Sequence, residues 1–421
     1  MGAPHLLIGN SAAALAAIDW IRKFDAQQPI VVVNREEGPA YSRVALPYYV
    51  SGERTLESLM IRARADYGRQ GVELVERETV VRVDPDGEVE LEGGRRIAFG
   101  ACLVATGSEC IRPPITGLDR VPHHYLWTLE DAIGLRRACE AGARTGVVIG
   151  GGFIGMLAAE ALRKRRMRLT IVEAAPQLMP QLLDADGAQR FATAVTESGQ
   201  AVRLGTAVAS VGRANGSIEV VLEGGDRIQA DVVVVATGVR PCLQAVRGGT
   251  IPIGGGILVD EYLRTRHERV YAAGDVAEVR DFISGAPAIH AIWPSAVDQG
   301  RIAGANMAGK RLPYQGSLGM NVVELFGVTL AEIGRFLEAA GDDVKLLGGP
   351  GARMENYRKV VVDREGRMVG AVYVGEENGV AEMGVIHHAI KRRERWRDFT
   401  PGRPPRFTYA HLVHAAQRTV S

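Results

Sequence analysis

The sequence has little cysteine, little net charge and no long apolar run. Only four of its 421 residues are cysteine, and no two form a Cys-x-x-Cys pair, so a dithiol relay and the thiolates of an iron–sulfur cluster are excluded. The net charge of +1 gives no reason to expect nucleic acid or an acidic membrane surface as a partner. No apolar run reaches the roughly 20 residues that span a bilayer. We therefore predict no metal site and no membrane segment.

The remaining composition is that of a globular protein. A length of 421 residues allows three domains, and 46% hydrophobic with 24% charged residues is ordinary. The apolar N-terminus has no basic region and enters the first predicted strand within a few residues, so we expect no signal peptide. Few, scattered cysteines fit a reducing compartment, and we expect a cytoplasmic protein.

A glycine-rich turn follows the predicted strand 147–149. It is formed by Gly150, Gly151, Gly152, Phe153, Ile154 and Gly155, and a helical stretch at 156–162 follows it. In this pattern Gly150 permits the tight turn, Gly152 lets the backbone approach a pyrophosphate, and Gly155 allows close helix packing. The next predicted strand, 169–172, ends at Glu173, where a carboxylate would bind a ribose diol. This arrangement is a strong dinucleotide signature.

A degenerate copy of the same turn lies near the N-terminus. The predicted strand 5–8 is followed by Gly9, while Ser11 and Ala14 replace the second and third glycines. A serine is small and can itself donate to phosphate, and the predicted helix 12–24 still offers N–H groups and a positive dipole end. After the strand 30–33, Glu36 is the candidate ribose ligand.

Both copies are closed by the same tripeptide. Ala105, Thr106 and Gly107 end a strand after the first copy, and Ala236, Thr237 and Gly238 do so after the second. The segment 270–275, which ends in Gly274 and Asp275, comes after the second unit has closed. We therefore predict that the second unit is inserted into the first and that the tripeptides mark the crossings. Two independent nucleotide domains in tandem are the alternative.

From residue 5 to about residue 330 these motifs resemble the FAD- and NAD-binding pyridine nucleotide-disulfide oxidoreductase family. The segments 41–47 and 293–307 resemble its branch of nitrite, ferredoxin, rubredoxin and coenzyme A-disulfide reductases. The resemblance implies that Asp275 holds the FAD ribityl chain, Glu36 the adenosine ribose and Arg43 the pyrophosphate region, and that Glu173 holds the NAD ribose. The implied cofactor-binding set is Gly9, Ser11, Ala14, Glu36, Arg43, Val80, Ala105, Thr106, Gly107, Arg112, Gly274 and Asp275 for FAD, and Gly150, Gly152, Phe153, Ile154, Gly155, Glu173 and Gly238 for NAD.

Two departures from the family pattern concern the flavin. Thiol-dependent members carry a redox cysteine just before the Leu-Pro of this segment, where this chain has Val44. Many relatives pair a lysine with a glutamate near the flavin, and here those positions are Tyr48 and Leu157. We therefore expect each of the four cysteines to be a small, buried apolar residue. Pro47, Tyr48 and Trp293 are expected flavin neighbours, with a plain core tryptophan as the alternative for Trp293, and no residue is assigned a catalytic role.

The predicted fold class is α/β, with two Rossmann-like nucleotide-binding domains, the NAD domain inserted in the FAD domain, and a C-terminal α+β domain. The FAD domain takes residues 1–112 and 239–313, the NAD domain 113–238, and the last domain 314–421. In the last domain, strands are predicted at 322–327, 360–363 and 369–374, followed by a helix from 381.

The end of that predicted helix carries a basic run. Its residues are Lys391, Arg392, Arg393, Arg395 and Arg397 around Trp396. A solvated helix face explains them, and a docking patch for an acidic electron carrier is the alternative.

The sequence thus predicts an FAD-dependent NADH/NAD oxidoreductase. Since it holds no cluster ligands, an iron–sulfur protein or subunit must be its electron-transfer partner. The length, the opening segment 6–17 and the cysteine-free flavin site resemble the FAD-containing, NAD-linked subunits of 2-oxoacid dehydrogenase complexes of the phenylglyoxylate type, which implies a hetero-oligomeric complex. A free-standing ferredoxin or rubredoxin reductase is one alternative, and a non-catalytic nucleotide-binding subunit is another.

Overall fold

The computed structural model describes residues 2–214, 216–346, 356–377 and 380–398, arranged in two compact units. The first unit comprises residues 1–111, 127–129 and 239–318, and the second 112–126, 130–238 and 319–421. The first unit is therefore built from segments on both sides of the second in the sequence. This confirms the predicted fold class, whereas the exact boundaries of three domains stay a prediction.

The first unit is built around a parallel sheet in the order β18-β7-β1-β2-β3. Its strands are β1 (His5–Ile8), β2 (Ile30–Asn34), β3 (Val72–Glu76), β7 (Ala101–Val104) and β18 (Val270–Ala272). Every residue of β1, β7 and β18 is buried, as expected for parallel strands covered on both faces. The late strand β18 completes a sheet that begins at residue 5.

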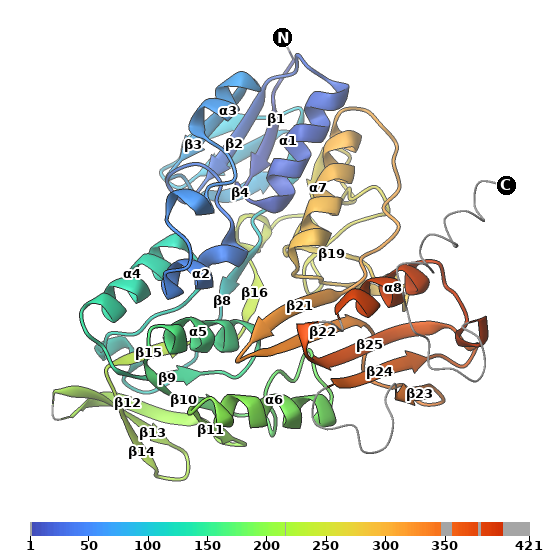
Figure 1. Ribbon diagram of the computed structural model, residues 1–421. Helices are drawn as coiled ribbons and strands as arrows, with labels where there is room; N and C mark the ends of the chain where they lie inside the picture. Colours follow the sequence, from blue (N-terminus) through green and yellow to red (C-terminus); the bar gives the residue numbers. More distant parts are fainter. Residues whose placement is uncertain (1, 215, 347–355, 378–379, 399–421) are drawn as a thin grey trace. The chain divides into compact units, whose positions relative to one another are not determined.

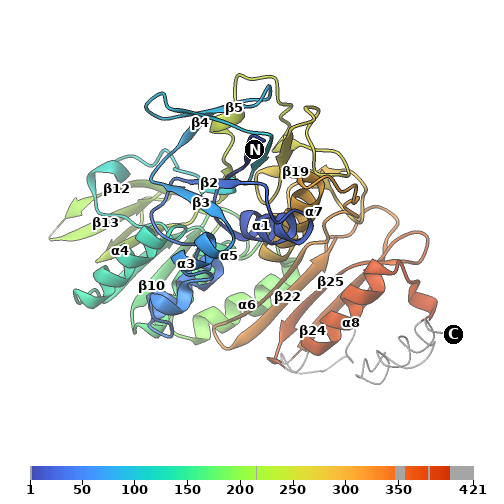
Figure 2. The ribbon, with the colours of Figure 1, turned by 90° about the horizontal axis from the view of Figure 1, so that it is seen from above.

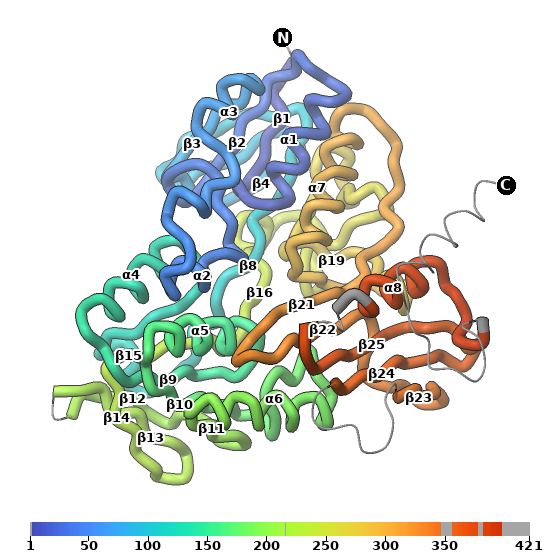
Figure 3. Tube along the Cα trace, viewed as in Figure 1, coloured from blue at the N-terminus to red at the C-terminus, as the bar shows by residue number. Residues whose placement is uncertain are grey.

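Helices and smaller sheets surround this core. The helices are α1 (Ala12–Phe24), α2 (Leu46–Ser51), α3 (Arg64–Arg69) and α7 (Trp293–Met307). The small sheets contain β4 (Val80–Asp84), β5 (Glu88–Leu91) and β6 (Arg96–Ala98); β17 (Ile257–Leu258), β19 (Ala277–Arg280) and β20 (Pro287–Ala288); and β8 (Ser108–Cys110) with β16 (Val239–Pro241). Short 3-10 turns lie at Arg43–Ala45, Glu57–Leu59 and Gln244–Val246. Figure 1 and the tube trace in Figure 3 show the gold α7 beside the blue α1.

In the first unit, α1 and α7 approach each other closely. A Cβ on Gly300 would lie 2.1 Å from the carbonyl oxygen of Ala13, and one on Gly304 would lie 2.4 Å from that of Ala17. Only glycine fits at these positions of α7, because such distances are shorter than any van der Waals contact.

The second unit contains a parallel sheet in the order β11-β10-β9-β15. These strands are β9 (Thr145–Ile149), β10 (Arg168–Glu173), β11 (Ala201–Leu204) and β15 (Val232–Val235), with α4 (Leu129–Glu140), α5 (Phe153–Lys164) and α6 (Ala185–Glu197). An antiparallel sheet adds β12 (Val208–Ala214), β13 (Ser217–Leu222) and β14 (Arg227–Ala230), and a 3-10 turn lies at Leu118–Arg120.

The C-terminal part of this unit is a five-stranded antiparallel sheet in the order β21-β22-β25-β24-β23. Its elements are β21 (Met320–Leu325), β22 (Val328–Gly334), β23 (Asp343–Leu346), β24 (Asn356–Val362), β25 (Met368–Gly375) and α8 (Val380–Lys391). Figure 2 shows α8 running along β25, and the helix also contacts β22. Three of these strands were predicted; β22 and β23 were not. The helix ends at Lys391, so the expectation that it carries the whole basic run was wrong.

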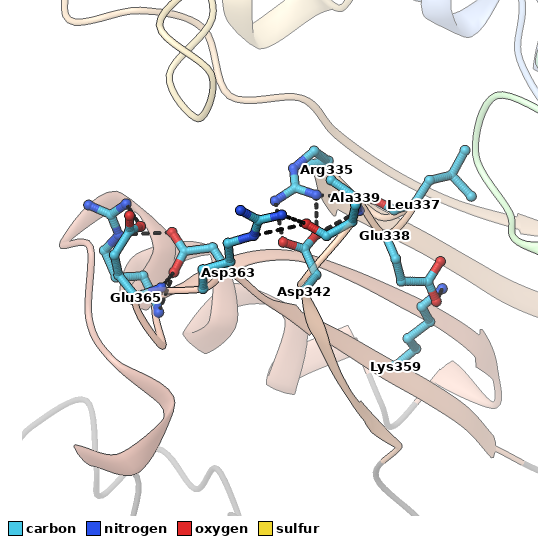
Figure 4. Close-up of polar contacts among 11 residues, drawn as sticks. Arg335, Leu337, Glu338, Ala339, Asp342, Lys359, Asp363 and Glu365 are labelled. Atoms are coloured by element: carbon cyan, nitrogen blue, oxygen red, sulfur yellow. Dashed lines mark hydrogen bonds and ion pairs between the residues drawn. The ribbon is translucent and has the colours of Figure 1, made fainter.

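A buried lysine ties the C-terminal sheet to α6. The side chain of Lys359 is 3% exposed, and its Nζ lies 2.7 Å from Glu338 and 2.8 Å from Asp184. Asp184 also caps α6 by accepting from the N–H of Gly187 at 3.0 Å. Figure 4 shows Lys359 beside Glu338 and, farther along the loop, Arg335 paired with Asp342. Because two carboxylates compensate one ammonium, this buried charge is satisfied.

Candidate functional site

The turn between β9 and α5 has the geometry that a dinucleotide needs. Gly150 has φ +108°, and a Cβ there would lie 2.3 Å from the carbonyl oxygen of Ala236. A Cβ on Gly155 would lie 1.9 Å from the carbonyl oxygen of Gly150, so α5 starts very close to its own turn. Gly152 precedes α5 as its N-cap, and no atom of the described residues lies within 4 Å of the place its Cβ would take. A helix N-terminus offers N–H groups and a positive dipole end to a phosphate.

Glu173 stands at the end of β10 next to this turn. Its Oε2 accepts from the N–H of Gly151 at 2.6 Å, and its Oε1 accepts from the N–H of Ala175 at 2.7 Å. These two bonds hold the carboxylate beside the glycine turn, where it can accept hydrogen bonds from a ribose diol.

The first copy repeats the close approach at its first glycine. Gly9 has φ +110°, and a Cβ there would lie 2.2 Å from the carbonyl oxygen of Ala105. Ala14 takes the place of the third glycine and is fully buried. Ser11 is the N-cap of α1, but its side chain makes no capping hydrogen bond. The hydroxyl is thus not committed to the helix, which fits the expectation that it faces phosphate.

The strand register gives a position that sequence reasoning missed. In the first copy the N–H of Gly9 donates to the carbonyl oxygen of Val33 at 2.8 Å. In the second copy the N–H of Gly150 donates to the carbonyl oxygen of Val172, also at 2.8 Å. Asn34 therefore occupies in the first copy the position of Glu173 in the second. Comparison of the two hydrogen-bond registers is the signal that identifies it, and that signal is absent from the sequence.

Glu36, two residues after Asn34, interacts with two neighbouring polar side chains. Its Oε2 accepts from the hydroxyl of Tyr41 at 2.6 Å, and its Oε1 pairs with Arg43. The Nδ2 of Asn34 donates to the carbonyl of Glu36 at 2.8 Å. The structure thus brings Glu36 and Arg43 together, and their roles at the ribose and pyrophosphate stay predictions.

Arg43 and Asp275 are electrostatic neighbours. The Nη1 of Arg43 donates to the carbonyl of Trp127 at 2.9 Å. Burial raises the pKa of Asp275, and a hydrogen bond from Ser108 together with the charge of Arg43 offsets this only in part. A half-buried carboxylate that accepts from a hydroxyl and lies in the field of a guanidinium is suited to accept hydrogen bonds from a polyol chain.

The other expected flavin residues lie in four places. Pro47 is buried in α2 while Tyr48, its neighbour, is 42% exposed. Trp293 is the first residue of α7, partly buried against the core of the first unit. Val80 is buried at the start of β4, and Arg112 belongs to the second unit, where its guanidinium lies 5.5 Å from the ring of Tyr125.

The last glycine of each closing tripeptide, and Gly274 beside Asp275, have the positive φ that favours glycine. Gly107 has φ +66°, Gly238 φ +106° and Gly274 φ +82°. The hydroxyl of Thr106 donates to the carbonyl of Cys242 at 2.8 Å, which ties the first tripeptide to the segment after the second.

Of the four cysteines only Cys102 is buried, and the other three are half-buried, so the expectation that all four are buried was wrong. Burial raises the pKa of Cys102, which is fully buried, and of Cys139. Burial also raises the pKa of Cys242 to about 11. Val44, at the place of the family's redox cysteine, is 58% exposed. Among the described residues, no group of three His, Cys, Asp or Glu side chains could hold a metal ion.

The basic run begins at Lys391, the last residue of α8, and continues through the turn that follows the helix. Lys391, Arg392, Arg393, Arg395 and Arg397 are exposed, Trp396 is half-buried, and Arg392 pairs with Glu394 at 3.0 Å. Its use as a docking patch stays a prediction. In the parts of the chain described, no helix is both long enough and apolar enough to cross a membrane.

Comparisons with known proteins identify the family. The family described as pyridine nucleotide-disulphide oxidoreductase matches residues 4–300. The epsilon subunit of NADH-dependent phenylglyoxylate dehydrogenase from Aromatoleum evansii is 34% identical over 94% of this chain and 93% of its own length. Rhodocoxin reductase from Rhodococcus erythropolis is 34% identical over 74% of this chain and 73% of its own length.

A solved structure shows the same fold. The NAD-dependent persulfide reductase of A. fulgidus superposes with a TM-score of 0.88 at 26% identity, covering 99% of this chain and 83% of that one. The match extends over both units and includes the C-terminal sheet.

Proposed function

Since the chain belongs to the pyridine nucleotide-disulphide oxidoreductase family, we propose that it moves electrons between NAD(H) and an iron–sulfur protein, as the NAD-linked subunit of a larger 2-oxoacid dehydrogenase complex of the phenylglyoxylate type. Members of this family bind FAD and NAD(H), and the chain is an oxidoreductase. The observation that carries the proposal is the presence of two dinucleotide turns in a chain without a redox thiol.

The first unit fits FAD. The steric cradle at Gly9, which a Cβ would fill, and the uncommitted hydroxyl of Ser11 suit a pyrophosphate. Arg43 and Asp275 supply a cation and a half-buried acceptor for the rest of the cofactor. When bound, flavin accepts a hydride and releases electrons singly, and the protein supplies position and electrostatics.

The second unit fits NAD(H). The open side of Gly152 leaves room for a pyrophosphate, and Glu173 is held where it can accept from both hydroxyls of the adenosine ribose. The same carboxylate repels a 2′-phosphate, which supports a preference for NADH over NADPH.

The number and positions of the cysteines support an electron acceptor outside this chain. The four cysteines lie at positions 102, 110, 139 and 242, too scattered to ligate a cluster together, and the flavin segment has valine in place of a thiol. The electrons must therefore leave to another protein. The identity to the epsilon subunit over nearly the whole length of both chains supports a complex with further subunits.

A free-standing reductase for a small iron–sulfur protein is the second candidate, favoured by the 34% identity to rhodocoxin reductase. An affinity-tagged chain purified from its native source separates the two. We expect stoichiometric iron–sulfur subunits to accompany it, with 2-oxoacid-dependent reduction of NAD in the eluate. A chain that elutes alone and reduces an added ferredoxin with NADH would replace the complex by the free-standing reductase.

A further inference from the structure

The Gly274–Asp275 turn of the first unit is held from two sides by buried side chains. The N–H of Gly274 donates to the Oε1 of Gln299 at 2.7 Å. The Oδ2 of Asp275 accepts from the hydroxyl of Ser108 at 2.6 Å. Ser108 lies on β8 and Gln299 on α7, so two distant segments converge on one turn.

Gln299 is oriented by a chain of hydrogen bonds behind it. Its side chain is 0% exposed, and its Nε2 donates to the hydroxyl of Ser317 at 3.2 Å. Ser317 is 1% exposed and shares a 2.7 Å hydrogen bond with the hydroxyl of Tyr314. Since the amide nitrogen donates toward Ser317, only the amide oxygen is left to accept from Gly274, which fixes the orientation of Gln299.

Ser108 is oriented through its own backbone. Its carbonyl accepts from the Nε1 of Trp127 at 2.8 Å, and its side chain is buried. The hydroxyl directed at Asp275 therefore cannot swing into solvent. A hydrogen bond to a charged carboxylate is stronger than one between neutral groups.

Comparison of the two tripeptides assigns this serine to the first unit alone. Ser108 follows Ala105, Thr106 and Gly107, whereas Val239 follows the identical tripeptide at 236–238. Valine cannot donate a hydrogen bond. If Ser108 served only to close a tripeptide turn, both copies would need it, so its place beside Asp275 points to the cofactor of the first unit.

We propose that Ser108 and Gln299 are positioning residues of the FAD site, which hold the Gly274–Asp275 turn in its binding geometry before the cofactor arrives. The inference rests on the proposed place of Asp275 at the FAD. Ser108 fixes the carboxylate and Gln299 the backbone, so neither has to contact the flavin. A turn ordered in advance spares the cofactor the conformational entropy of ordering it.

The affinity of the apoprotein for FAD tests the serine, measured by quenching of flavin fluorescence. We expect Ser108→Ala to weaken FAD binding by about tenfold and Asp275→Asn by more. Because Ser108 acts through Asp275, adding Ser108→Ala to Asp275→Asn should weaken binding by less than about twofold further. Ser108→Thr, which keeps the hydroxyl, should restore most of the affinity.

Three results would overturn this inference in different ways. Wild-type affinity in Ser108→Ala, or an equal loss in the Asp275→Asn background, removes Ser108 from the positioning role and leaves the proposed function intact. Wild-type affinity in Asp275→Asn removes Asp275, and the inference with it, from the FAD site. An apoprotein that binds no FAD at all contradicts the proposed function itself.

A matched pair tests the glutamine. Gln299→Leu removes the acceptor of the Gly274 N–H, whereas Ser317→Ala removes only the far end of the same hydrogen-bond chain. We expect Gln299→Leu to weaken FAD binding by about tenfold and Ser317→Ala by less than about threefold. If Gln299→Leu does not fold, Gln299→Glu, which keeps an acceptor oxygen, must bind FAD more tightly than Gln299→Ala. Equal affinity of these two variants would overturn the role of Gln299.

Discussion

The two nucleotide turns of this chain share their first glycine and differ at the third. Gly9 and Gly150 both lie against the alanine carbonyl of an Ala-Thr-Gly segment. A Cβ added to either glycine would lie at almost the same distance from that carbonyl oxygen. In the second copy, Gly155 lets α5 approach the carbonyl of Gly150. In the first copy the equivalent residue is Ala14, and the close approach involves a different part of the unit, where Gly300 and Gly304 of α7 meet the backbone of α1.

The difference shows that glycine is required by close backbone approach and not by its place in a motif. A degenerate motif can therefore keep its turn with alanine at the third position, as long as glycine remains where two backbones approach closely. The carboxylates differ as well. Glu173 is held by backbone N–H groups of its own turn, while Glu36 is held by the side chains of Tyr41 and Arg43.

The largest effect is expected from a Cβ at the third glycine of the second copy. Gly155→Ala should lower the free energy of unfolding by about 3 kcal/mol, although alanine is otherwise the better helix former, because its Cβ meets the Gly150 carbonyl. Urea unfolding measures this. Gly152→Ala is the matched control, since its Cβ meets nothing, and it should keep stability within about 0.5 kcal/mol. Equal stability of the two variants would contradict the steric account.

The next effect concerns the glycines of α7 that face the backbone of α1. Gly300→Ala places a Cβ 2.1 Å from the Ala13 carbonyl, so we expect a loss of about 2 kcal/mol in stability. FAD should also dissociate faster, which gel filtration of the yellow protein would detect. Arg301→Ala, at a half-exposed position of the same helix, is the control and should be neutral. Unchanged stability of Gly300→Ala would show that α1 and α7 separate without cost.

A smaller effect is expected on nucleotide choice. Glu173→Arg removes a ribose acceptor and offers a cation to a 2′-phosphate, so the ratio of kcat/KM for NADH over NADPH should fall by roughly 10- to 100-fold. Steady-state reduction of a dye measures it. The corresponding change at Asn34 in the first copy should leave the ratio alone. A Glu173→Arg enzyme with the wild-type ratio would mean that Glu173 is not at the ribose.

The smallest effect is expected from thiol modification. At pH 8 roughly one Cys242 in a thousand is thiolate if its pKa is about 11, and Cys102 is fully buried. Iodoacetamide under native conditions should therefore change NADH-to-dye turnover by less than about twofold. Because the pKa of Cys242 is raised, its thiolate and hence its reactivity appear only as the pH rises toward that value. Rapid inactivation at pH 8, with protection by NADH, would show that a thiol participates.

Much of the architecture could be predicted from the sequence, because the glycine turns and the buried strands are local patterns. The late strand β18 was predicted from Gly274 and Asp275, and it lies beside β7 in the first sheet. The family prediction is confirmed by the match over residues 4–300.

The remaining features depend on contacts between distant residues. The equivalence of Asn34 in the first copy to Glu173 in the second follows from strand register, which no short sequence pattern specifies. The bond from Ser108 to Asp275 joins residues 167 positions apart. Strands β22 and β23 were missed in the C-terminal sheet. The predicted helix was extended past Lys391, where α8 ends, because helix ends are weakly encoded.

The central claim is that the first copy holds FAD and the second delivers hydride from NADH. Anaerobic titration of the FAD-loaded chain with NADH tests it most directly. The account predicts that the yellow protein is bleached by about one NADH per flavin, and that Glu173→Arg requires far more NADH for the same bleaching. A colourless protein after reconstitution with FAD, or a flavin that excess NADH leaves oxidised, would contradict it.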